Sequence, residues 1–350
     1  GIGMLYLYPP VGVGLLSLAN TGLGWLLDAL SYLAMPSNAL VYQSITSFWI
    51  LLLLLLVAAI LLAPKGLPGR WLAAFWLLPL FLTKNPVPAL GGFRVSFLDV
   101  GQGLSVVVQT QKHSLVYDTG AKFSSSFSAA KAVILPFLRE QGIGHIDTLV
   151  LSHSDSDHAG GAALLRESMP IEKTLSSFEL STPFQQCRAG QHWEWEGVHF
   201  RILHPTDALS EIENDQSCVL SIENNQGRVL LTGDISWRSE QALIGRLGSE
   251  LVSTVLQVPH HGSLTSSAEE FIDSVKPQYA VFNVGYRNRF GFPKHEVVER
   301  YRYVGATILR TDREGAVHFE FIAGAKKVSM STTRLKQHFW QNLSESNFAE

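Results

Sequence analysis

The first part of the chain is dominated by two long apolar runs. Residues 48–63 carry no charge and are mostly leucine, and two more residues at the start bring the run to the ~17–25 that cross a bilayer. A polar turn, Pro64 to Arg70, separates this run from a second one. We therefore predict membrane helices near residues 46–63 and 71–90. The alternative is a buried hairpin of a soluble protein. It fits less well, because tryptophan at the ends of an oligo-leucine run is typical of a lipid interface.

After residue 90 the pattern becomes that of a soluble α/β domain. Several short β-branched or alternating runs predict strands, and two stretches have helical spacing. The expected strands are residues 93–100, 104–110, 114–117, 148–151, 199–203, 218–222, 228–232 and 255–258, and the expected helices are residues 129–141 and 159–168. Many strands with interspersed helices, and no Gly-x-Gly-x-x-Gly start, predict an α/β fold with four layers, αββα.

Charge follows the same division of the chain. Of the 350 residues, 16% are charged, which is below the ~25% of an average soluble protein. Before residue 90 the charged residues are Asp28, Lys65, Arg70 and Lys84. We divide the chain into a membrane segment (residues 1–90), a soluble domain (residues 91–340) and a polar tail (residues 341–350). Residues 1–40 are apolar and glycine-rich, which fits a further helix or an interfacial segment.

The few charges of the membrane segment also predict its orientation. Lys65 and Arg70 lie in the loop between the two apolar runs, and positively charged loops tend to stay in the cytoplasm. The second run then returns the chain to the other side, so residues after 90 are expected to be extracytoplasmic. The chain begins at Gly1 without a basic segment ahead of the apolar stretch, so we expect the C-terminal part of a longer protein rather than a signal peptide.

Net charge and cysteine content narrow the classes further. A net charge of −3 excludes a globally basic nucleic-acid binder but leaves room for a local basic groove. Cys187 and Cys218 are too few for a disulfide framework or a cysteine-rich zinc site. We expect two ordinary small residues here, with a single bridge as the alternative.

The densest chemistry lies in the run His153-Ser154-Asp155-Ser156-Asp157-His158. It follows a predicted buried strand, and imidazole and carboxylate together suit zinc, manganese or iron. Four candidate ligands this close together suit two ions placed side by side. The alternative is a polar turn in which Asp157 caps the following helix, but it leaves both histidines unexplained.

This run resembles the His-x-His-x-Asp-His signature of the metallo-β-lactamase superfamily, with Asp155 in place of the second histidine. Other segments match the same family. Asp118, in Tyr-Asp-Thr-Gly, resembles the aspartate that supports the site from outside the ligand shell. Asp234, at the end of Leu-Leu-Thr-Gly-Asp, resembles the bridging carboxylate, and His260-His261 resembles the late histidine motif. The resemblance implies a metal-dependent hydrolase.

A narrower resemblance comes from the combined motifs. Phe97 to Gly103, the Asp155 variant, His260-His261-Gly262-Ser263 and Arg310 to Gly315 are together similar to the C-terminal domain of ComEC, the membrane channel of bacterial DNA uptake. The similarity covers roughly residues 93–322. It implies a place in the bacterial inner membrane, with the hydrolase domain outside the cytoplasm, DNA as a partner and further components of an uptake apparatus. It also implies degradation of the DNA strand that is not transported.

The ligand set that the resemblance implies is His153, Asp155, Asp157, His158, Asp234 and His260, with Asp118 behind it. Asp157 and His261 are expected to be catalytic, with His261 acting as a ligand in place of His260 or as a general acid. Two divalent ions can hold a bridging hydroxide and stabilise both oxygens of an in-line displacement at a phosphodiester. A carboxylate at Asp155 hardens the site, so we expect Mn²⁺, followed by Zn²⁺.

Two positions depart from the family pattern. A histidine is often present between the first cluster and the bridging aspartate, and here Asn214, Asp215 or His204 is the candidate to complete the metal shell. Phe292 stands where related sequences often carry a histidine, and it cannot bind a metal. Both departures put the completeness of a two-ion shell in question.

Basic residues near the end of the domain are interleaved with aromatic ones. Arg287 and Arg289 are our candidates for contact with single-stranded DNA, which binds well to arginine beside aromatic platforms. The alternative is an ordinary solvated face. Our first hypothesis is a membrane-anchored, metal-dependent DNA nuclease. The second is a phosphodiesterase or esterase for small molecules, and the third is a non-catalytic DNA-binding module of a channel.

Overall fold

The computed structural model describes residues 2–34, 48–63, 69–78, 86–124, 127–206, 213–325 and 327–334. They belong to two compact units, residues 1–82 and 83–350, and each unit is considered by itself. The predicted polar tail, residues 341–350, lies outside the described residues.

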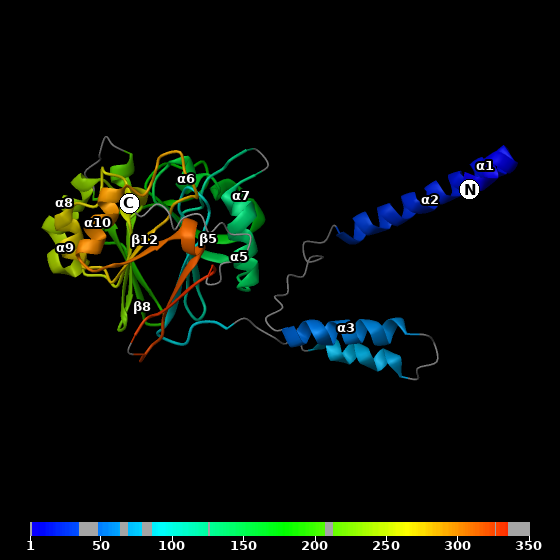
Figure 1. Ribbon diagram of the computed structural model, residues 1–350, viewed down its shortest axis with the longest axis horizontal. Coiled ribbons are helices and arrows are strands. Elements are labelled where there is room, and N and C mark those ends of the chain that lie inside the picture. Colours follow the sequence, from blue (N-terminus) through cyan, green and yellow to red (C-terminus); the bar gives the residue numbers. More distant parts are fainter. Residues whose placement is uncertain are drawn as a thin grey trace, which may run out of the picture. The chain divides into compact units, whose positions relative to one another are not determined.

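The N-terminal unit is helical and strongly apolar. Its described elements are α1 (Ile2–Leu7), α2 (Pro9–Ala34), α3 (Phe48–Leu62) and the 3-10 helix η1 (Arg70–Leu77) (Figure 1). Within the described residues, one stretch, Pro9–Leu33, is both long and apolar enough to cross a membrane, and α3 is apolar but shorter. α3 coincides with the first predicted membrane helix. Of the second predicted helix, residues 71–77 form 3-10 turns, residues 79–85 lie outside the described part of the chain, and residues 86–90 are not helical, so the prediction is wrong at that end.

Two stacked β-sheets form the frame of the second unit. Among the described residues, one sheet has eight strands in the order β15-β14-β1-β2-β3-β4-β5-β6, and the other has seven in the order β13-β12-β11-β10-β9-β8-β7. The first sheet contains β1 (Phe93–Phe97), β2 (Val106–Gln109), β3 (Ser114–Tyr117), β4 (Ile146–Leu151), β5 (Ile171–Ser176), β6 (Gln185–Gln186), β14 (Val317–Phe321) and β15 (Ser329–Thr332). The second contains β7 (His192–Trp195), β8 (Val198–His204), β9 (Val219–Asn224), β10 (Gly227–Leu231), β11 (Val255–Gln257), β12 (Tyr279–Phe282) and β13 (Thr307–Arg310).

Helices cover the outer faces of both sheets. In Figure 1, α5 and α7 lie beside the first sheet, and α8, α9 and α10 lie on the far side of the second. These elements are the π-helical turn η2 (Ala130–Ile134), α5 (Leu135–Glu140), α6 (Ser156–Ala159), α7 (Ala162–Ser168), α8 (Trp237–Leu247), α9 (Glu269–Val275) and α10 (His295–Tyr303). Shorter turns are η3 (Asn214–Gln216), η4 (Gly248–Leu251), η5 (Pro259–Gly262) and α11 (Thr311–Glu314). The predicted αββα architecture is confirmed.

The hydrophobic core has three layers, which follow from this stacking. The middle layer lies between the sheets, where alternate strand residues point inward. The stacked rings of Phe93 and Phe321, with centroids 4.3 Å apart, belong to it. The outer layers lie under α8–α10 and under α5 and α7. A core on both faces of each sheet fixes the strand ends, and with them the loops that leave those ends.

One expectation about the cysteines is wrong. Cys187 and Cys218 are not two ordinary residues but form a buried disulfide, with Cα atoms 5.9 Å apart. The bridge joins the segment after β6 to the residue that precedes β9, across 31 positions of sequence. It therefore ties the edge of the first sheet to the second sheet.

Candidate metal centre

Loops that follow five parallel strands carry the polar residues of one site. Asp118 follows β3 and His153 follows β4 in the first sheet, while Asp234, His261 and Asn283 follow β10, β11 and β12 in the second. β3 is parallel to β4, and β10, β11 and β12 are parallel to one another, so within each sheet these loops leave from the same edge. Ligand sites of α/β folds form at such carboxyl ends.

The run from His153 to His158 turns sharply after β4 and enters α6. Asp155 occupies the N-cap position of α6, but its side chain makes no capping bond. Instead its Oδ2 lies 3.3 Å from Nε2 of His153, and nearly half of the side chain is exposed. The alternative interpretation of this run, as a turn in which Asp157 caps the helix, does not describe it.

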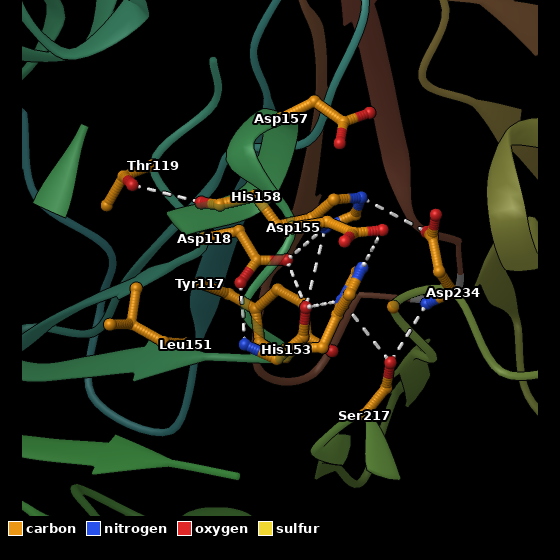
Figure 2. A network of polar contacts seen from close by, with 12 residues as sticks. Tyr117, Asp118, Thr119, Leu151, His153, Asp155, Asp157, His158, Ser217 and Asp234 are labelled. Carbon is orange, nitrogen blue, oxygen red and sulfur yellow. Dashed lines mark hydrogen bonds and ion pairs between the residues drawn. The ribbon is translucent and has the colours of Figure 1, made fainter. Parts of the chain in front are cut away.

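Asp118 holds the first loop in place from behind (Figure 2). Its Oδ1 accepts the backbone N–H of Ser152 at 2.7 Å, and its Oδ2 accepts the Ser152 hydroxyl at 2.6 Å. Oδ2 also accepts Nδ1–H of His158 at 2.7 Å, and both side chains are fully buried. Because a carboxylate can only accept here, the proton of neutral His158 is on Nδ1, and Nε2 presents a lone pair to the site.

His261 is oriented in the same way from the opposite sheet. Its Nδ1–H donates to the backbone carbonyl of Asn283 at 2.7 Å, which leaves Nε2 free to accept. That Nε2 lies 3.1 Å from Nε2 of His158. It also lies 3.4 Å from Asp157 Oδ2 and 3.5 Å from Asp234 Oδ2. Two imidazole lone pairs and two carboxylates therefore face one small volume.

Two overlapping groups in this volume are able to hold a metal ion. In the first, nitrogen and carboxylate ligand atoms of His153, His158 and Asp234 all lie within 4.8 Å of one another. The second group has the same spacing and consists of Asp157, His158 and His261. The single free lone pair of His158 can serve one ion only, so a second ion would be held by Asp157 and His261, with Asp234 Oδ2 3.5 Å from His261 Nε2 and within reach of both ions.

Electrostatics shows that this volume attracts positive charge. Burial disfavours a charged His158, but Asp234 and then Asp118 outweigh it, so the pKa of His158 lies well above its usual value. Burial likewise opposes the charge of Asp234, yet His158 and His261 hold its pKa well below the usual range. For Asp157, burial is opposed by a hydrogen bond that His261 donates from Nε2 when its imidazole is protonated, and the pKa falls to about 2.

Two buried ligand atoms of this site also indicate that a cation fits it. Nε2 of His153 and Oδ1 of Asp234 are buried and make no hydrogen bond of good geometry, although Asp155 Oδ2 lies 3.3 Å from the first atom and His158 Nε2 lies 3.2 Å from the second. Such atoms cost about 1–3 kcal/mol each when nothing compensates them. Both point into the first group, and both are ordinary ligand atoms for a divalent ion. A metal ion would satisfy them together.

The structure changes the preference between the two late histidines. We expected His260 as the ligand, but His261 is the member of the second group. Nε2 of His260 lies 3.8 Å from Asp234, and its Nδ1 contacts the Thr265 hydroxyl at 3.0 Å. Both histidines have positive φ, 49° and 55°, a conformation that a non-glycine residue adopts at a cost. This backbone turns His261 inward and leaves His260 at the rim.

None of the three residues expected to complete the shell contributes to it. His204 is bonded through Nε2 to the backbone carbonyl of Asp215 at 2.6 Å. The Asp215 side chain accepts from Ser236 N–H and from the Ser239 hydroxyl at the start of α8. Asn214, in η3, belongs to neither metal-binding group of the described residues.

Ser217 is the residue that the sequence did not point to. Its Oγ lies 3.4 Å from Nδ1 of His153, accepts the Asp234 backbone N–H at 3.2 Å and donates to the carbonyl of Asn214 at 2.8 Å (Figure 2). It therefore orients two ligands without being one. A serine two residues before a strand carries no sequence signal for such a role.

The Phe97–Gly103 motif has a structural explanation beside this centre. Gly103 has φ +130°, and a Cβ there would meet the backbone oxygen of Asp157. Leu104 N–H donates to that same oxygen at 3.1 Å. Only a residue without a side chain allows this loop to pack so closely on the ligand run.

Arg287 and Arg289 lie on the loop after β12, beyond Asn283. Arg287 stacks on the ring of Tyr286, and Arg289 stacks on that of Phe290. Phe292 does not bind in the centre but packs against both late histidines, with ring centroids 6.0 Å from His260 and 6.5 Å from His261. Phe292 is thus a neighbour of the candidate centre, and Arg289 is connected to it through the ring of Phe290.

These features define a class: an αββα protein with a centre of histidines and aspartates at the strand ends of two stacked sheets. The family model described as "Metallo-beta-lactamase superfamily" matches residues 98–285. The chain belongs to the metallo-β-lactamase superfamily.

Similarity to individual proteins narrows the position within that superfamily. The chain is 37% identical over 295 residues to "Competence protein ComA" of Neisseria gonorrhoeae, which covers 83% of this chain and 41% of that protein. It is 35% identical over 251 residues to "Recombination protein 2" of Haemophilus influenzae, covering 69% of this chain and 30% of the relative. A shorter match, 27% identical over 176 residues, is to "Ribonuclease J" of Mycolicibacterium smegmatis, covering 44% of this chain and 30% of that protein.

The predicted resemblance to ComEC proteins is confirmed by the competence relative. The chain spans less than half of the length of the first two relatives. The superfamily consists of proteins that generally are metal-dependent hydrolases, and the described residues include groups suited to a metal.

Proposed function

We propose that this chain carries a two-metal phosphodiesterase that degrades DNA during uptake by a bacterial cell. One observation supports this most strongly: Asp157 and His261 lie beside the group of His153, His158 and Asp234, with His261 Nε2 3.5 Å from Asp234 Oδ2. A pair of adjacent divalent ions suits the in-line displacement at a phosphodiester, because each ion can stabilise one of the two oxygens involved. We infer two ions, Mn²⁺ first and Zn²⁺ second.

The residues of the candidate centre have different proposed roles. His153, Asp155, His158 and Asp234 would hold one side of the centre, and Asp157 with His261 the other. When bound, the ions supply Lewis-acid activation of water and neutralise phosphate charge. Asp157 is a carboxylate at any physiological pH, since its pKa is about 2. His261 belongs to the second group of ligand atoms, so we assign it to ligation rather than to acid catalysis, and His260 is left at the rim.

DNA as the substrate is supported by the relatives and by the loop after β12. Two relatives are named for competence and recombination, and a third for a ribonuclease. The Arg287 and Arg289 side chains lie on the rings of Tyr286 and Phe290, an arrangement suited to single strands. We propose that the domain hydrolyses the strand that is not transported.

We further propose that the domain faces the extracytoplasmic side of the inner membrane. The apolar helices α2 and α3 support membrane attachment, and Lys65 and Arg70 support an inside position for the loop between the apolar runs. The Cys187–Cys218 bridge agrees, because disulfides persist in oxidising compartments and are rare in the cytosol.

The test uses the 350-residue chain in detergent micelles with a labelled single-stranded oligonucleotide and Mn²⁺. We expect cleavage that EDTA abolishes, about two ions per chain by elemental analysis, and loss of both in the variant Asp157→Ala with His158→Ala. Asp147→Asn, a buried aspartate outside the centre, serves as control and should keep both. An equal rate in EDTA would overturn the proposal. Hydrolysis of small diesters without oligonucleotides would favour the small-molecule enzyme instead, and absent cleavage with one ion or none would favour the non-catalytic module.

A further inference from the structure

A row of aromatic rings leads outward from the metal centre. The ring of Phe292 lies nearly parallel to that of His261, at 26° and 6.5 Å between centroids. The ring of Phe290 in turn lies nearly parallel to that of Phe292, at 16° and 5.6 Å. We call Phe290 and Phe292 the aromatic strip. It begins against a candidate ligand and ends at the surface two ring contacts away.

The outer end of the strip is exposed and flanked by cations. Phe290 is 44% exposed, so part of its ring is open to a ligand. The guanidinium of Arg289 lies 4.8 Å from its ring centroid, and the ammonium of Lys294 lies 5.4 Å from that of Phe292. A flat apolar surface between two positive charges matches a nucleotide, which offers a flat base and a negative phosphate.

The loop that carries the strip is held by its own hydrogen bonds. The amide oxygen of Asn288 accepts Phe292 N–H at 3.0 Å, and its amide nitrogen donates to the carbonyls of Gly285 and Phe292 at 3.1 and 2.7 Å. Lys294 N–H donates to the carbonyl of Gly262, beside the late histidines, at 3.0 Å. The rings are therefore positioned relative to the metal centre before any ligand arrives, which lowers the entropic cost of binding.

One acidic side chain near the strip is neutralised within its own helix. On α10, Glu299 pairs with Arg302 of the same helix. Lys294 also donates to the backbone carbonyl of Phe290, which is a neutral partner and leaves its positive charge in place. The positive character of the strip thus remains available to a phosphate.

We propose that the aromatic strip is a subsite that stacks one unpaired nucleobase next to the cleaved linkage. The base lies against Phe290, with the Arg289 guanidinium over it or on the adjoining phosphate, and the linkage one or two nucleotides away reaches the metal centre. A paired base cannot leave its stack without cost, so the subsite selects single strands over duplexes. This inference rests on the proposed nuclease function and specifies that the site recognises an unpaired base.

The test asks whether removing a base from the DNA and removing the Phe290 ring from the protein affect the same interaction. The 350-residue chain in detergent with Mn²⁺ is given end-labelled oligothymidylates in which one nucleotide at a time lacks its base. Base-to-aromatic stacking contributes about 1–3 kcal/mol, so we expect cleavage to fall about 5- to 150-fold at the linkage a fixed distance from the missing base. In Phe290→Ala all linkages should be cut at that low rate, and the pattern caused by the missing base should disappear.

Two further variants separate stacking from folding. Phe290→Trp keeps a flat ring and should restore both the rate and the dependence on the missing base. Tyr303→Ala, which removes a 93% exposed ring on α10, should leave both unchanged. If the chain cuts DNA but a missing base has no positional effect, or if it has the same effect in Phe290→Ala, the subsite does not exist. If no variant cuts DNA under any condition, the nuclease proposal itself has failed.

Discussion

Asp118 offers the sharpest test of how the centre is organised, because it touches a candidate ligand without being one. Replacing it with asparagine preserves its shape but puts an NH₂ group where one carboxylate oxygen was. Oδ2 accepts two bonds, from the Ser152 hydroxyl and from Nδ1–H of His158. The hydroxyl can rotate and accept instead, whereas Nδ1–H then faces another donor.

The consequence for His158 can be worked out from this geometry. Its imidazole either keeps an unpaired buried N–H, at a cost of about 1–3 kcal/mol, or moves the proton to Nε2. In the second case the nitrogen that faces Asp234 and His261 no longer has a lone pair. Partners of this kind behind a metal ligand typically account for 10- to 100-fold in affinity. We therefore expect Asp118→Asn to fold and to bind Mn²⁺ about 10- to 100-fold more weakly.

The measurement is Mn²⁺ affinity by calorimetry, together with thermal unfolding in EDTA. The chain contains a matched control, because Asp147 is also buried and also accepts a backbone N–H, a serine hydroxyl and a histidine N–H. It lies at the start of β4, away from the candidate ligands. Asp147→Asn should lower stability by a similar amount and leave Mn²⁺ affinity unchanged. Equal affinity losses in the two variants would refute the reasoning.

Three further predictions concern stability and packing. Burial raises the pKa of Glu240 from 4.5 to about 7, so its contribution to stability is present below pH 4.5 and is lost as pH rises through 7. Between pH 5 and 8, thermal unfolding should show that the wild type loses up to about 3 kcal/mol of stability relative to Glu240→Gln. A stability difference between the two proteins that stays constant with pH would contradict this. Replacing Cys187 and Cys218 with serine removes a bridge across 31 positions and should cost about 3–4 kcal/mol in unfolding free energy, an effect that reductant should reproduce in the wild type. Gly103→Ala should abolish activity by displacing the ligand run, whereas Gly101→Ala, which meets open space at a similarly positive φ, should only lower the unfolding temperature.

The architecture could be predicted because many of its strands have a local hydrophobic pattern. β3 and β4 were expected within two residues of their ends, since runs buried on both faces are continuously apolar. β5 to β7 and β12 to β15 were not predicted. β12, for example, has only the short stretch Tyr279 to Phe282, and its place in the sheet depends on β11 and β13 on either side. Pairing across long sequence distances decides such strands, and local pattern does not record it.

The candidate centre could be anticipated only where its residues are contiguous. His153 to His158 form a dense cluster that no ordinary turn needs, so their meeting was evident from spacing. The choice between His260 and His261 was not, because both have the same chemistry and adjacent positions. It depends on a left-handed backbone at both residues and on the carbonyl of Asn283, which is brought there by the next strand. Metal occupancy and the role of each ligand remain predictions.

The disulfide links the interior of the candidate centre to the extracytoplasmic position that we propose for the domain. Cys218 N–H donates to the carbonyl of Ser152, and its own carbonyl accepts the buried hydroxyl of Tyr117 at 2.6 Å. Ser152 directly precedes His153, and Tyr117 directly precedes Asp118. The bridge therefore stiffens the backbone from which these side chains project. In a reducing compartment this constraint would be absent at the point where the ligands must be held most firmly. An extracytoplasmic domain would keep it, and the orientation inferred from Lys65 and Arg70 gives the same side on independent grounds.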